Sequence, residues 1–123
     1  MSIRISGSLL GAAFAITVTA APAADGGQYT GNELFPACRR FVDEKLNRDT
    51  VFLGAVCAGI VSGTSYMGNL TETGLTCLNI PDGVTLGQEV RVVVSYIEAH
   101  PAKMHESFRK LALEALRTAW PCK

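Results

Sequence analysis

The chain has 123 residues, of which 48% are hydrophobic and 18% charged, and its eleven basic side chains balance eleven acidic ones. A chain of this length is expected to form one domain, and its apolar content excludes an intrinsically disordered protein. The formal net charge of zero also argues against a nucleic-acid-binding surface and against a basic arm that holds a protein on a membrane.

The first 23 residues have the features of a secretory signal peptide. Arg4 supplies the positive start, an uncharged apolar run extends from Ile5 to Ala20, and the small residues at 21–23 fit the cleavage pattern. The apolar run is about 16 residues long, which is shorter than the roughly 20 residues that a spanning helix needs. We therefore predict a signal peptide over 1–23 and an exported domain over 24–123; cleavage after Ala24 fits the same pattern.

All four cysteines lie in the mature segment, namely Cys38, Cys57, Cys77 and Cys122. In an oxidising compartment, four cysteines in a short chain indicate two disulfides. A zinc site is disfavoured because no C-x-x-C pair occurs and neither histidine lies near a cysteine in the sequence. We predict no metal site and no cofactor.

The hydrophobic periodicity predicts an all-α fold, a small four-helix domain made of two antiparallel helical hairpins. Two capping boxes mark helix starts, at Thr30 with Glu33 and at Thr85 with Gln88. The helical period, together with the second cap, decides against a strand at the valine run 92–94. The four predicted helices run from about Asn32 to Leu46, Val51 to Leu70, Leu86 to about Ala99, and Pro101 to about Trp120.

The segment Val51–Leu70 contains no charged residue and is expected to be the most buried part of the domain. A membrane-spanning helix is the other interpretation, but its glycines and serines lower its hydropathy. A glycine costs about 1 kcal/mol in a helix interior. We therefore expect tight packing at the four glycines, which are Gly54, Gly59, Gly63 and Gly68.

The hairpin geometry favours one pairing of the cysteines. At 1.5 Å of rise per residue, Cys38 and Cys57 lie at heights that differ by only about 3 Å in an antiparallel first hairpin. Cys77 precedes the third helix and Cys122 follows the fourth, so both belong at the open end of the second hairpin. We predict Cys38 with Cys57 and Cys77 with Cys122. The alternative Cys57–Cys77 stays open because the flexible loop that contains Cys77 is long enough to reach Cys57.

The sequence offers no catalytic constellation. Two disulfides consume every thiol, and His100 and His105 are five residues apart, which does not put them on one helix face. The glycine patterns of nucleotide-binding loops are missing from the sequence. We predict that the protein is not an enzyme, has no catalytic residue, and works by presenting a surface.

Residues 57–63, Cys-Ala-Gly-Ile-Val-Ser-Gly, resemble the C-x-G-x-x-x-G helix of the Rap/Tai immunity proteins of type VI secretion. The segments 77–101 and 115–122 are similar to the C-terminal half of that family, so the resemblance covers about residues 50–122. Two departures, Ile60 in place of an aromatic residue and a longer spacing from Cys77 to Pro81, fall near the surface that would set partner choice.

The resemblance implies a periplasmic helical protein, often dimeric, that binds a cell-wall amidase effector and covers the cysteine–histidine site of that enzyme. The connection 68–83 is unusually long, and long loops are often functional. We expect it to carry the partner-binding residues Thr71, Glu72, Asn79 and Asp82. Two alternatives are a periplasmic helical chaperone or stress protein and a small ligand-carrying helical protein, and the latter would show a sizeable apolar pocket.

Overall fold

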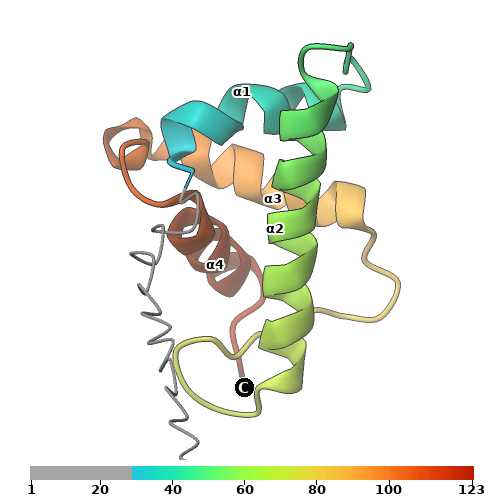
Figure 1. Cartoon of the computed structure of the whole chain (residues 1–123). Helices are drawn as coiled ribbons and strands as arrows, with labels where there is room; N and C mark the ends of the chain where they lie inside the picture. The colour runs from blue at the N-terminus through green and yellow to red at the C-terminus, as the bar shows by residue number, and fades with distance from the viewer. Residues whose placement is uncertain (1–28) are drawn as a thin grey trace, which may run out of the picture.

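The computed structural model describes residues 29–123, so the predicted signal peptide and the five residues after it lie outside the described part. The helices in chain order are α1 (Gly31–Val42), α2 (Val51–Leu70), α3 (Leu86–Ala99), the short 3₁₀ helix η1 (Pro101–Lys103) and α4 (Phe108–Ala119). Residues 29–123 contain no strand, which confirms the all-α fold. Figure 1 shows α1 and α3 both crossing the long α2, with α4 beside it.

Both predicted capping boxes are present. The Glu33 carboxylate accepts hydrogen bonds from the backbone N–H of Thr30 at 2.7 Å and from its hydroxyl at 2.9 Å, and these bonds lower the pKa of Glu33. At the start of α3, the Thr85 N–H donates to the Gln88 side chain at 2.8 Å and the Gln88 N–H donates to the Thr85 hydroxyl at 3.3 Å. These caps satisfy backbone donors that have no partner within the first helical turn.

The predicted end of the first helix at Leu46 is wrong, because α1 ends at Val42. Glu44 has a φ of 55°, in the left-handed region, and this turns the chain away from the helix axis. The turn brings Leu46 against α2, where a Cβ added to Gly54 would lie 2.6 Å from a Leu46 methyl carbon. The helix therefore ends at Val42 because the packing of Leu46 against α2 is more favourable than a further turn of helix.

The predicted last helix is also wrong in its first third. A helix from Pro101 to Trp120 is expected from the sequence, whereas residues 104–107 form a turn between η1 and α4. The carbonyls of Met104 and Glu106 accept the backbone N–H groups of Asn32 at 2.8 Å and Gly31 at 3.0 Å. The turn therefore satisfies donors at the start of α1, which a continuous helix would leave without protein partners.

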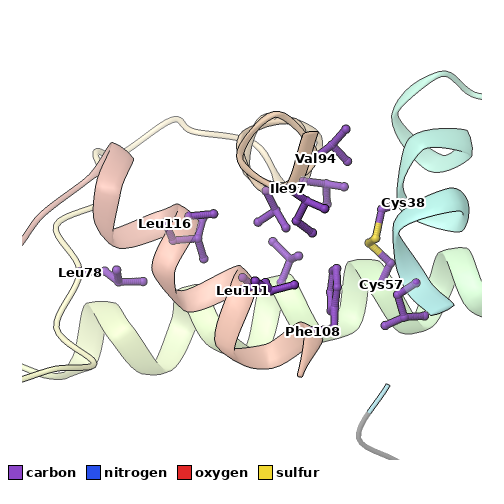
Figure 2. Packing of buried hydrophobic residues seen from close by; sticks show 14 residues of the cluster. Cys38, Cys57, Leu78, Val94, Ile97, Phe108, Leu111 and Leu116 are labelled. Atoms are coloured by element: carbon purple, nitrogen blue, oxygen red, sulfur yellow. A yellow bond between two sulfur atoms is a disulfide. The ribbon is translucent and has the colours of Figure 1, made fainter. Parts of the chain in front are cut away.

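The core lies where the four α-helices meet (Figure 2). Phe108, Leu111 and Leu116 of α4 are fully buried against the valines of α3 and against Val61 of α2. Figure 2 shows the Cys38–Cys57 disulfide beyond the Phe108 end of α4 and Leu78 at the Leu116 end. One apolar face of α4 therefore spans the core between two disulfide-bonded regions.

Both predicted disulfides are present. Cys38 and Cys57 link α1 to α2 with their Cα atoms 5.6 Å apart, and Cys77 and Cys122 link the long connection to the C-terminus with their Cα atoms 5.5 Å apart. The alternative Cys57–Cys77 pairing is thereby excluded. All four cysteines are consumed, so no thiol is free.

The prediction that Val51–Leu70 is the most buried segment holds for only one face of α2. The buried positions form a single stripe, while much of the rest of the helix faces solvent. By length and composition α2 could cross a membrane, a test that core helices of soluble proteins also pass. Its disulfide to α1 and its packing against α1, α3 and α4 make it the central element of the helical domain. The buried residues of the stripe are Gly54, Cys57, Ala58, Val61, Ser65 and Gly68.

Candidate partner-binding surface

The long connection between α2 and α3 is attached to the C-terminus of the chain. The Cys77–Cys122 disulfide is accompanied by an isolated antiparallel bridge between Leu78 and Pro121. The Asn79 N–H donates to the Trp120 carbonyl at 3.2 Å. Three consecutive residues of the connection are thus held by the segment that follows α4.

The same part of the connection is attached to the end of α2. The Leu78 N–H donates to the Gly68 carbonyl at 3.0 Å, and the Asn69 side chain accepts the Ile80 N–H at 3.1 Å. Leu78 is buried and packs so closely on α2 that any side chain at Gly68 would collide with it. Residues 77–80 therefore form a fixed anchor that divides the connection into two exposed lobes, 71–76 and 81–85.

The two lobes lie on different sides of α2. Figure 1 shows the chain leaving the end of α2 in a loop to one side, whereas the segment that enters α3 passes on the other side. Gly74 in the first lobe and Gly83 in the second have φ values of 95° and 88°, which glycine adopts without strain. Each lobe thus turns at a glycine, and the long connection is not one continuous surface.

The four residues predicted for partner binding are divided between these parts. The Thr71 hydroxyl caps the end of α2 by donating to the Met67 carbonyl at 2.9 Å, and Glu72 is exposed in the first lobe. Asn79 is exposed on the anchor, and Asp82 is exposed in the turn of the second lobe. The structure therefore places Thr71 and Glu72 together and separates them from Asp82.

A small cavity of about 360 Å³ lies beside the anchor, bounded by the Cys77–Cys122 disulfide and by residues of α3 and α4. On its wall, the Glu114 carboxylate accepts hydrogen bonds from Lys103 at 2.8 Å and from the Tyr96 hydroxyl at 3.0 Å. The Lys103 bond is the main reason that the pKa of Glu114 is lowered and the pKa of Lys103 raised. His100 stacks on Tyr96, so this group of side chains holds the corner between α3 and α4.

An open apolar groove of about 610 Å³ lies between α2 and α4, and in the sequence analysis only the ligand-carrier alternative expects such a pocket. Val56, Ile60 and Met67 of α2 and Leu113 of α4 supply its apolar walls, and Arg109 is the charged residue that lines it. The groove also reaches Thr76 in the first lobe, so it continues into the predicted binding connection. The signal in the sequence is the uncharged run of α2, which predicts the most buried segment of the domain but does not indicate which of its faces is open.

The arrangement is suited to recognition of a partner. The four sulfurs are bonded in pairs, and His105 is exposed at the turn before α4. Among residues 29–123, no group of three or more potential metal-ligating side chains comes together. What the described surface offers is two anchored lobes and an apolar groove beside one of them.

The model of the Rap1a immunity proteins matches residues 30–122 of this chain. The matched segment begins at the first capping box and ends at the last cysteine, so it includes all four α-helices and both disulfides. No curated protein and no solved structure matches the chain.

Proposed function

This chain belongs to the Rap1a immunity protein family, and from that membership we propose that it binds and sterically inhibits a peptidoglycan amidase effector of type VI secretion in the periplasm. The match over residues 30–122 carries the proposal. An immunity protein against a secreted effector acts by binding, so we propose a non-enzymatic inhibitor. Two disulfides are typical of a protein that works outside the cytoplasm, in agreement with the predicted signal peptide.

The connection between α2 and α3 is the proposed contact with the effector, chiefly through the lobe 71–76 and the neighbouring anchor. Their attachment by the Cys77–Cys122 disulfide and by the hydrogen bond from Asn79 to Trp120 supports this choice. A surface that is already ordered loses less conformational entropy when it docks, so more of the contact energy appears as affinity. Steric inhibition of an enzyme needs such a surface and no chemistry of its own.

The test uses the mature protein and a purified peptidoglycan amidase effector of type VI secretion. Alanine substitutions at Thr71, Glu72, Asn79 and Asp82 are expected to weaken binding together by about 100-fold, because a few central residues carry most of the energy of an interface. The melting temperature should change little, since these side chains are outside the core. Calorimetric titration measures the affinity and thermal unfolding measures the stability.

Arg48 and Asp49 supply the matched control, because both are exposed polar residues in a different loop, before α2. Their alanine variants should bind the effector as the wild type does. If the fourfold variant keeps wild-type affinity, the connection is the wrong surface. If the wild-type protein itself fails to bind, the proposed function is wrong.

We also propose a homodimer, which the resemblance to the family implies. The outer face of α2 supports it, because Phe52 and Tyr66 are each 66% exposed and Leu70 is 62% exposed. Exposed apolar groups that lie on one element mark an interaction site more often than scattered ones do. Sedimentation velocity should give twice the mass of the mature chain, and a monomer at micromolar concentration would contradict this.

The groove is the observation that favours a second candidate function, in which the protein carries a small apolar ligand. A volume of about 610 Å³ is enough for a small molecule. However, binding pockets enclose most of a ligand, whereas Gly59, Gly63 and Met67 on this groove are exposed to solvent. Native mass spectrometry of the purified protein distinguishes a carrier from an inhibitor of an effector, since a carrier would retain a bound small molecule.

A further inference from the structure

We propose that the groove between α2 and α4 binds an amphipathic helix of the effector, whose apolar face packs on α2 and whose carboxylate pairs with Arg109. This inference rests on the proposed function, since it assigns the segment to that effector. It adds a second contact to the one proposed for the connection. The groove meets the first lobe at Thr76, so one partner can contact both.

The dimensions of the groove suit a short helix. Its α2 wall runs from Val56 to Gly68, which at 1.5 Å per residue is about 18 Å, or three helical turns. The wall is apolar at Val56, Ile60 and Met67, and α2 carries no charged side chain. An amphipathic helix laid in an apolar groove buries one stripe of side chains and keeps its polar face in water.

The charge at the rim specifies the occupant further. Arg109 is the charged residue among those lining the groove, and within residues 29–123 it has no ion-pair partner. An apolar surface beside an exposed guanidinium is complementary to a segment that combines apolar side chains with a carboxylate. A bidentate pair of arginine with carboxylate also fixes the orientation of the segment.

Two glycines let the occupant approach closely. A Cβ added at Gly59 or Gly63 would meet nothing within 4 Å, so packing inside the domain does not require glycine at either position. Both residues line the groove, where the lack of a side chain brings the backbone of α2 to the surface. A helix with small or apolar residues on one face can then pack against that backbone.

A second copy of the chain is a poorer occupant than the effector. A two-fold contact through this surface would place a concave groove against an identical concave groove and leave both unfilled. No acidic side chain lines the groove, so Arg109 would find no counter-charge on the same surface of a second copy. Shape and charge thus both favour a convex, acidic segment of a different protein.

The decisive variant is Gly63→Leu, whose Cβ would meet nothing within 4 Å and whose side chain would occupy part of the groove that Gly63 lines. With the purified amidase effector as the probe, its dissociation constant should rise by about 100-fold while its melting temperature is unchanged or higher. Arg109→Glu should raise the dissociation constant by about tenfold, with a larger effect at low salt. Ser62→Leu is the control, since Ser62 is the exposed neighbour of Gly63 but does not line the groove.

The outcomes separate this inference from the proposed function. Wild-type affinity in both Gly63→Leu and Arg109→Glu overturns the groove site and leaves the proposed function standing, because the effector still binds. If the wild-type protein does not bind the effector, both fail. If Gly63→Leu converts a dimer to a monomer in sedimentation velocity, the occupant is a second copy and the inference is wrong.

Discussion

The two faces of α2 are built from the same small and apolar residue types but have different structural roles. On the buried face, Gly54 lies against Leu46 and Gly68 against Leu78, and a side chain at either position would collide with its neighbour. On the exposed face, Gly59 and Gly63 have open space around them and line the groove. Glycine on this helix therefore permits close packing within the domain on one face and, in our proposal, close approach of a partner on the other.

The largest effect is expected from removing the disulfide on the buried face. In the chain-entropy model, the ring closed by Cys38 and Cys57 contributes roughly 3 kcal/mol. Replacing both residues by alanine also leaves a cavity in the core, so the total loss is about 5 kcal/mol. Urea unfolding measures it, and a loss below about 1 kcal/mol would show that α1 and α2 are held together mainly by other contacts.

Gly68→Ala tests the close contact at the end of the same face. The added methyl group must displace Leu78, which should cost about 1–3 kcal/mol as overpacking does. Because Leu78 belongs to the anchor, the change should also weaken effector binding. An unchanged free energy of unfolding would mean that Leu78 moves aside at no cost.

Ser65 is the buried polar residue of this face, and its hydroxyl donates to the Glu89 carboxylate of α3 at 2.8 Å. Ser65→Ala removes the donor and is expected to cost about 1 kcal/mol. A double-mutant cycle with Glu89→Gln measures the coupling between the two side chains. Additive effects of the two substitutions would contradict a direct interaction.

Gly63→Ala on the exposed face should have the opposite sign. Alanine is a better helix former and meets no neighbouring atom here, so the variant should gain up to about 1 kcal/mol. Gly59→Ala offers an independent repeat at the other open position. A loss of stability in both variants would show that glycine is needed for packing within the domain on the exposed face as well.

The smallest effect is expected from acid, and it should arise outside α2. The pKa of Glu114 is lowered from 4.5 by its bonds to Lys103 and Tyr96, so its contribution to stability is present above pH 4.5. Protonation below that pH removes it, and the melting temperature should fall as the pH drops further. The side chains of Lys103 and Glu114 are 37% and 27% exposed, so solvent screens the pair and the change is small. Glu114→Gln should flatten the pH dependence, and an unchanged slope in that variant would assign it to other groups.

Sequence patterns predicted the parts of the fold that depend on local signals. The bounds of α2 match the uncharged run from Val51 to Leu70, and those of α3 follow from its hydrophobic periodicity and from the capping box at Thr85. The cysteine pairing follows from the adjacency of consecutive helices. The end of α1 and the start of α4 depend on contacts between distant residues. Leu46 packing at Gly54, and the carbonyls of Met104 and Glu106 accepting N–H groups from α1, leave no signal in local periodicity.

In the candidate site, too, local sequence signals predict some features and contacts between distant residues determine the others. Length and turn residues marked the connection 68–83 as exposed, but they did not reveal that Leu78 and the Cys77–Cys122 disulfide divide it into two lobes. The position of the groove could not be predicted, because an uncharged helix indicates burial without showing which of its faces stays open. Which glycines are packed and which are open depends on the positions of Leu46, Leu78 and α4, and only the three-dimensional structure gives these.

Titration of the proposed amidase effector with the mature protein is the most direct test of the proposed inhibition. We predict that cleavage of purified peptidoglycan stops when one immunity protein chain has been added per effector, and that the mature protein alone releases no product. Full amidase activity in the presence of excess mature protein, or cleavage by the mature protein itself, would show that the protein is not the non-enzymatic inhibitor that we propose.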